Sequence, residues 1–155
     1  DWCEWEHDLP NEGYVLWNKN RPGDVCTPEH MVSLARLRPN VKFLTTFTTR
    51  GDRVENDNIT VTGVQPHDVM KKMIQQAGVY LSTTKETFGI GVLEAMAAGV
   101  PVLGFAYGGN LDLIEHGVTG YLARPGSYED LANGLDYCLM HRDVLSENSK
   151  IVVQK

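Results

Sequence analysis

Two glutamates and two glycines are interleaved in the segment KETFGIGVLEAMAAGVPVLGF, residues 85–105. Glu86 and Glu94 are eight positions apart, and Gly89 and Gly91 lie between them. Glycines at the start of a helix let a ligand approach the backbone, whose free N–H groups attract an anion such as a phosphate. A carboxylate one turn into that helix can accept hydrogen bonds from a ribose diol. Glu86, in the preceding loop, could hold the hydroxyls of a second sugar.

The same segment has a simpler interpretation, a tight turn shaped by the glycines with both glutamates in solvent. The eight-residue spacing across the glycines, followed at once by the apolar run PVL, favours the binding site over the plain turn.

Short apolar runs alternate with helical patterns along the chain and supply the elements that would position this segment. Strands are expected at 14–17, 41–47, 59–63, 79–84, 101–105 and 120–124. Helices are expected at 28–37, 65–78, 90–99, 108–117 and 127–140, the last with Ser127 and Asp130 as a capping box, followed by a polar, helical tail at 141–155. This alternation predicts one α/β domain over residues 1–155, a doubly wound parallel sheet covered on both faces.

Three polar loops, NKNRPG, TTKETFG and AYGGN, directly follow expected strands. Ligands of such sheets bind outside the carboxyl ends of the strands. The three loops therefore predict a single crevice.

Composition excludes several other functions. A net charge of -6 argues against nucleic-acid binding, which needs a basic face. The three cysteines are scattered and form no CxxC pair, so neither a metal site nor a disulfide framework is expected. No stretch is apolar for long enough to form a transmembrane helix.

The segment ETFGIGVLEAMAAGVPVLGFAYGGNLDLIEHGVTGYLA resembles the donor-binding region of retaining glycosyltransferases of family 4. The family pattern is Glu-x7-Glu, then Ala-Met-Ala-x-Gly-x-Pro-Val, a Gly-Gly pair and a later Thr-Gly. The resemblance implies one Rossmann-like half of the two-domain GT-B fold, the C-terminal half that binds the sugar nucleotide. The N-terminal acceptor domain is then missing, residues 1–12 are a linker-like start, and the fragment alone is expected to be inactive.

The reaction implied by the resemblance is transfer of a hexose from a donor such as UDP- or GDP-hexose, with retention at the anomeric carbon. The acceptor is a glycan, a lipid or a small molecule held by the missing domain. Neither a metal nor another cofactor is expected. The implied location is the cytoplasm, including the inner face of a membrane.

The resemblance also assigns roles to single residues. Glu86 would contact the sugar and stabilise positive charge, and Glu94 would bind the ribose. The family has an Arg and a Lys that hold the diphosphate, but this sequence has WNKNRPGD in that region. The cations available there are Lys19 and Arg21, and either could neutralise the diphosphate. The sequence does not decide between them. The remaining donor-binding candidates are Thr87, Phe88, Gly89, Ile90 and Gly91 in the motif loop, Gly63 and Val64 near the base, and Gly108 and Gly109 along the cleft.

Three alternatives stay open beside the transferase. One is a module that binds a nucleotide sugar without catalysing a reaction, and another is a domain of a sugar-nucleotide epimerase with a similar fold. The third, a nicotinamide-binding domain, is disfavoured because Gly-x-Gly-x-x-Gly does not follow the first expected strand.

Overall fold

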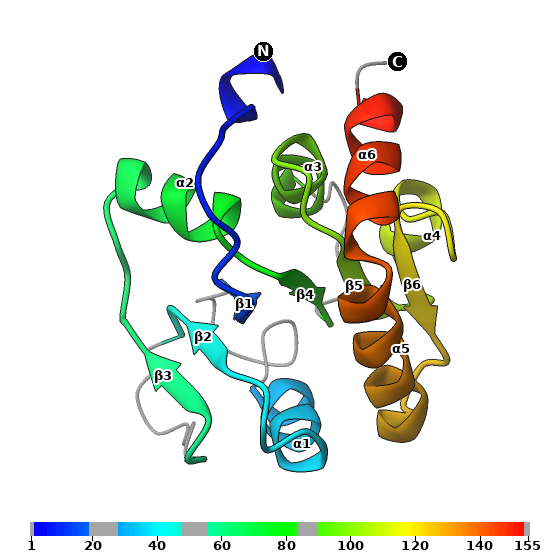
Figure 1. The fold of residues 1–155 in the computed structure, drawn as a ribbon. Helices are drawn as coiled ribbons and strands as arrows, with labels where there is room; N and C mark the ends of the chain where they lie inside the picture. Colours follow the sequence, from blue (N-terminus) through cyan, green and yellow to red (C-terminus); the bar gives the residue numbers. More distant parts are fainter. Residues whose placement is uncertain (1, 19–27, 48–55, 84–89, 154–155) are drawn as a thin grey trace.

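A parallel sheet forms the centre of the molecule (Figure 1). The computed structural model of the chain describes residues 2–18, 28–47, 56–83 and 90–153. Within these ranges six strands pair in the order β3-β2-β1-β4-β5-β6. They are β1 (Val15–Trp17), β2 (Phe43–Thr45), β3 (Ile59–Val61), β4 (Val79–Ser82), β5 (Val102–Phe105) and β6 (Gly120–Ala123).

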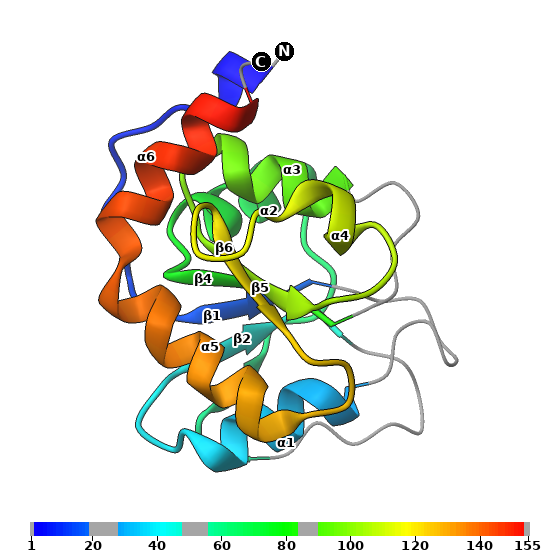
Figure 2. The same cartoon turned by 90° about the vertical axis from the view of Figure 1, so that its right-hand side faces the viewer.

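Helices cover both faces of this sheet, which confirms the doubly wound α/β prediction (Figure 2). α1 and α5 lie on one face, and α2 and α3 lie on the other. The helical elements are η1 (Trp2–Trp5), α1 (Glu29–Leu37), α2 (His67–Gln75), α3 (Ile90–Ala97), α4 (Asn110–Leu113), α5 (Tyr128–Met140) and α6 (Arg142–Val153).

Several elements are shorter than their sequence pattern predicts. The strand expected at 41–47 is limited to Phe43–Thr45, and the helix expected at 108–117 is limited to Asn110–Leu113. α4 ends early because Ile114 adopts an extended backbone, after which Gly117, at φ +78°, closes a turn that returns to β6. The polar tail does form a helix, α6.

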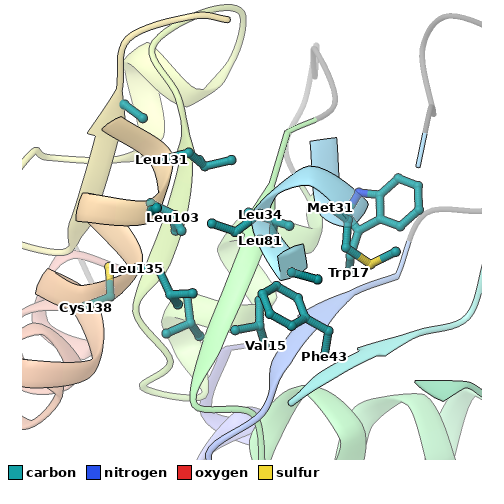
Figure 3. Close-up of a cluster of buried hydrophobic side chains, with 14 of the residues drawn as sticks. Val15, Trp17, Met31, Leu34, Phe43, Leu81, Leu103, Leu131, Leu135 and Cys138 are labelled. Carbon is teal, nitrogen blue, oxygen red and sulfur yellow. The ribbon is translucent and has the colours of Figure 1, made fainter. Parts of the chain in front are cut away.

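Alternate residues of each strand face opposite layers, as the pleat of a strand requires. Val15, Trp17, Leu81 and Leu103 pack with α1 and α5, as Figure 3 shows. On the other face Leu16, Tyr80 and Val102 pack with α2 and α3. Both layers are apolar, so the central strands are buried on both sides, which explains why they are apolar without alternation in the sequence.

Among the first twelve residues, expected to be linker-like, Trp5 and His7 contact the layer of α2 and α3. Trp5 is only 3% exposed, and Lys71 of α2 places its ammonium 5.2 Å from the centre of the Trp5 ring. His7 donates from Nε2 to the carbonyl of Ala98 (3.0 Å) and accepts at Nδ1 from the N–H of Leu9. Both ring nitrogens of His7 therefore have hydrogen-bond partners.

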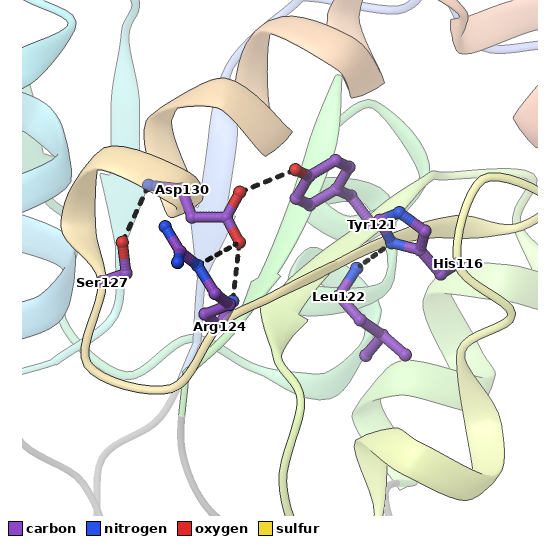
Figure 4. A network of polar contacts seen from close by, with 6 residues as sticks. All are labelled: His116, Tyr121, Leu122, Arg124, Ser127 and Asp130. Carbon is purple, nitrogen blue, oxygen red and sulfur yellow. Dashed lines mark hydrogen bonds and ion pairs between the residues drawn. The ribbon is translucent and has the colours of Figure 1, made fainter.

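A polar network joins the end of β6 to the start of α5 (Figure 4). Ser127 caps α5 by accepting from the N–H of Asp130 at 3.2 Å. The Asp130 carboxylate does not return to Ser127, as a full capping box would require. It accepts instead from the N–H of Arg124 and from the hydroxyl of Tyr121, both at 2.7 Å. The predicted capping box is therefore only half correct: Ser127 caps the helix, but the Asp130 carboxylate binds the end of β6 instead of the N-cap.

The outer side of β6 has a second such contact. The N–H of Leu122 donates to Nδ1 of His116 at 3.0 Å, and the His116 ring lies 4.6 Å from that of Tyr121 (Figure 4). Side chains from the flanking segments thus take up backbone donors of this strand.

Replacing Asp130 with alanine is expected to lower the free energy of unfolding by about 2 kcal/mol, since two hydrogen bonds to a charged group are lost. Burial alone would raise the pKa of Asp130, but the hydrogen bonds from Arg124 and Tyr121 outweigh it, so the pKa is lowered. A lowered pKa stabilises the fold above the unfolded-state value, and this contribution disappears as the pH falls through the folded-state value. The difference from wild type should therefore shrink below about pH 4 in urea titrations at several pH values.

Asp136 on the same helix is the matched control. Its carboxylate pairs with Arg38 at 2.6 Å, but this pair is solvent-exposed. Asp136→Ala is expected to lose less than about 1 kcal/mol. Equal losses for the two variants would show that the Asp130 network does not fasten β6.

Candidate functional site

The carboxyl ends of all six described strands lie along one edge of the sheet, because the strands are parallel. Asn18 follows β1, Thr83 follows β4 and Ala106 follows β5. The three polar loops singled out in the sequence therefore start at the same edge. Lys19, Arg21, Glu86, Thr87, Phe88 and Gly89 lie outside the described residues.

The winding of the chain reverses between β1 and β4. From β1 the sheet grows through β2 to β3 on one side, and from β4 it grows through β5 to β6 on the other. In open parallel sheets the crevice outside this reversal is the usual ligand site. β4 ends there, at Ser82, and the next described element is α3, which carries Glu94.

The start of α3 agrees with the positions deduced from the sequence. Ile90 is its first residue, with 62% of its surface exposed, and Gly91 is the second. Glu94 is the fifth residue, about one turn into the helix, and its side chain is half-buried. α3 thus carries Gly91 at its N-terminus and a carboxylate one turn later.

The residues after β3 form a tight turn at the same edge. Gly63 has φ +74°, a conformation that favours glycine, and Val64 is 68% exposed. Gln65 donates from its side chain to the carbonyl of Thr62 at 2.8 Å, which fixes this turn. The two candidates for base contact, Gly63 and Val64, are thus presented by a braced turn.

The loop after β5 is held against the end of β4. The hydroxyl of Tyr107 donates to the carbonyl of Thr83, and burial, together with Tyr128, raises the pKa of Tyr107, so the hydroxyl keeps its proton. Gly108 follows at φ +56°, and Gly109 is buried at the start of α4. The Gly-Gly pair predicted from the sequence thus lies beside the strand that leads into the glutamate motif.

Sequence reasoning missed two asparagines at this edge. Asn18 accepts from the hydroxyl of Tyr80 at 2.7 Å and lies 3.6 Å from the sulfur of Met70 in α2. Asn110 is fully buried and bonds to both β4 and β5. Neither has a spacing signal in the sequence, because their partners are distant along the chain.

Two buried polar atoms at the ends of β1 and β4 have no hydrogen-bond partner among the described residues. They are Nε1 of Trp17 and Oγ1 of Thr83. Buried polar atoms are nearly always paired in folded proteins.

His30, near the start of α1, packs on this same side of the molecule. Its Nδ1 is hydrogen-bonded to the hydroxyl of Tyr128 at 3.0 Å, and its ring meets that of Phe105 edge-on. Burial lowers the pKa of His30, although Glu29 opposes the shift, so the imidazole is neutral at pH 7. His30 is therefore a polar group whose hydrogen bond is satisfied within the fold.

Within the described ranges, no three side chains among His, Cys, Asp and Glu are grouped so that they could hold a metal ion. None of the described helices has the length and apolar character needed to cross a membrane.

Comparison with protein families identifies one matching model. The family described as "Glycosyl transferases group 1" matches residues 52–151, about two thirds of the chain. The match includes the glutamate motif, the Gly-Gly pair, the helices α2 to α5 and all but the last two residues of α6.

Individual relatives agree with this match. A glycosyltransferase of Methanocaldococcus jannaschii is 37% identical over 87 residues, which are 54% of this chain and 22% of the relative. Anabaena HepE, solved in complex with UDP, has a TM-score of 0.80 and 20% identity, covering 99% of this chain and 50% of HepE. The C-terminal domain of LpcC, a group 1 glycosyltransferase from Francisella tularensis, has a TM-score of 0.76 and 18% identity. The match covers 94% of this chain and 86% of the LpcC domain. The chain thus spans half or less of the first two proteins and most of the separate LpcC domain.

Proposed function

The chain belongs to the glycosyl transferases group 1 family, and on this premise we propose that it binds a nucleoside diphosphate sugar at the carboxyl edge of its sheet. The protein would then transfer the hexose to an acceptor hydroxyl, with retention at the anomeric carbon. One observation carries the proposal: β4 ends at the winding reversal, and α3, the next helix along the chain, presents Gly91 at its start and Glu94 one turn later.

In this proposal each part of the donor has a partner. Glu94 accepts hydrogen bonds from the ribose, and Glu86 holds the hydroxyls of the transferred sugar. The diphosphate lies at the N-terminus of α3, where Gly91 lets it approach the backbone. Lys19 or Arg21 neutralises the leaving group, so that the reaction proceeds without a metal ion.

The nucleotide is proposed to be UDP. HepE, whose fold this chain shares, has been solved with UDP and with UDP-glucose. The braced turn at Gly63 and Val64 is then the contact for the base, with GDP as the competing nucleotide.

The acceptor is proposed to bind a further domain of the whole protein, because the 87 aligned residues of this chain cover only 22% of its Methanocaldococcus jannaschii relative. The isolated chain would then bind donor but transfer little sugar. A cytoplasmic location, including the inner face of a membrane, is part of the same proposal.

Calorimetric titration with UDP, GDP and ADP tests the donor assignment. We expect saturable binding of UDP with a Kd between about 1 μM and 1 mM, the usual range for enzyme substrates. Uridine is the control and should bind much more weakly, because it lacks the diphosphate that α3 attracts. Failure of all three nucleotides to bind would refute the proposal. Binding by the whole protein without sugar transfer would favour a binding module instead.

A further inference from the structure

We propose that Asn110 is a positioning residue that holds the donor-binding loop after β5 in a fixed relation to the end of β4. This inference rests on the proposed function, because it concerns how the donor site is kept in shape. Asn110 itself is buried, so it would act through the backbone that it holds.

The carboxamide of Asn110 joins the ends of two strands. Its Nδ2 donates to the carbonyl of Ser82, the last residue of β4, at 2.9 Å, and to the carbonyl of Phe105, the last residue of β5, at 3.0 Å. Its Oδ1 accepts from the hydroxyl of Ser82, also at 3.0 Å. Both amide protons and the amide oxygen are thus used, so the side chain is fixed in one orientation.

The neighbouring strand has a glycine where this carboxamide needs space. A Cβ added at Gly104 would lie 2.6 Å from Nδ2 of Asn110 and 2.6 Å from the carbonyl oxygen of Ser82. Its backbone φ is not in the left-handed region, so glycine is required here by space rather than by conformation. Gly104 and Asn110 therefore form a matched pair in which the small residue accommodates the bridging one.

The Gly-Gly pair lies between two contacts to the end of β4. On one side the hydroxyl of Tyr107 donates to the carbonyl of Thr83, and on the other side Asn110 binds Ser82. Gly108 and Gly109 connect these two anchors. Asn110 contacts Ser82, the last residue of β4, and Tyr107 contacts Thr83, the next residue. The segment that contains Glu86 follows directly in the sequence.

This arrangement matters for a charged ligand. Backbone N–H groups stabilise a phosphate or a leaving group only when they are already oriented toward it. Glycines by themselves give a loose backbone, because they have the largest conformational freedom. Asn110 and Tyr107 restrict this freedom on either side of the glycine pair, of which Gly108 is partly exposed.

Three variants test the inference in the 155-residue chain. Asn110→Ala removes the bridge, and Ser82→Ala removes only the hydroxyl contact. Asn58→Ala is the matched control, because Nδ2 of Asn58 also donates to backbone carbonyls, those of Ala35, Arg38 and Val41, at 2.9–3.0 Å. Asn58 lies directly before β3, at the amino ends of the strands, whereas the proposed site lies at their carboxyl ends. Loss of the Asn58 side chain therefore tests stability without changing the site.

Two measurements apply to each variant beside the Tm. Backbone ¹⁵N relaxation of Gly108 and Gly109 in the ligand-free chain reports the mobility of the loop. Calorimetry with UDP reports the effect on the donor site. We expect Asn110→Ala to make both glycines mobile and to raise the Kd for UDP about tenfold to a hundredfold, as a small misplacement of binding groups does. Ser82→Ala should act in the same direction by about threefold.

Asn58→Ala is expected to lower the Tm without changing the relaxation of the two glycines or the Kd. Unchanged relaxation in Asn110→Ala, or equal Kd values for Asn110→Ala and Asn58→Ala, would overturn the inference. If Asn110→Ala does not fold, Ser82→Ala decides by the same criteria. A wild-type chain that binds no nucleotide would refute the proposed function, and the relaxation data would still decide whether Asn110 fixes the loop.

Discussion

Replacing Glu94 with alanine is expected to raise the Kd of the chain for UDP about a hundredfold, because two hydrogen bonds from the ribose to a charged carboxylate are lost. Glu94 is the fifth residue of α3, one turn from the helix start that would hold the diphosphate. Calorimetry of the variant measures the change directly. Glu86→Ala should differ, leaving the Kd for UDP within about threefold while lowering sugar transfer by the whole enzyme about a thousandfold.

The control for both variants is Glu147→Ala. Glu147 is an exposed residue of α6 that pairs only weakly with Lys150, at 3.8 Å. Its replacement should change neither the Kd nor the rate, and circular dichroism should show that all three variants are folded. Normal nucleotide binding by Glu94→Ala would mean that the ribose lies elsewhere and that the motif assignment is wrong.

Replacing Gly120 with alanine is expected to lower the free energy of unfolding by about 3 kcal/mol, the upper end of the usual cost of overpacking. Gly120 starts β6 and is paired with Val102 of β5. An added Cβ would overlap the carbonyl oxygen of Val102 and lie 2.9 Å from its carbonyl carbon. Because these are backbone atoms, no rotamer change can relieve the overlap, and β6 must move away from β5. Urea denaturation measures the loss.

Gly126→Ala separates this effect from the general cost of replacing a glycine. Gly126 has φ +79° and nothing within 4 Å of an added Cβ. The variant should lose about 1 kcal/mol through backbone strain alone. A loss for Gly120→Ala no larger than this would show that β5 and β6 can separate without much cost.

The architecture was predictable because the central strands are short apolar runs followed by polar loops. Residues such as Val79–Ser82 and Val102–Phe105 are buried on both faces, and this leaves an unmistakable apolar signature. Element ends were less predictable. α4 ends at Leu113, four residues before Gly117, because Ile114 is extended and the hydroxyl of Thr119 accepts from the N–H of Glu115. Neither Ile114 nor Thr119 is a strong helix breaker, so the sequence did not mark this end.

The site was predictable where its chemistry depends on local spacing. Gly91 and Glu94 are three residues apart in one helix, so their positions follow from the helical repeat. Asn110 was not predictable, because its partner Ser82 is 28 positions away and only the folded sheet brings them together. The same holds for the pairing of Asn18 with Tyr80, separated by 62 positions.

The side chains that fasten β6 have a consequence for self-association. A strand at the border of a sheet normally offers free N–H groups on which another extended chain can add, the first step of amyloid-like aggregation. Here the N–H groups of Leu122 and Arg124 are already taken by His116 and Asp130. The opposite border, β3, is only three residues long, too short to guide a long added strand. The sheet therefore resists recruitment of further strands at both borders, which protects a domain whose central strands are apolar enough to aggregate.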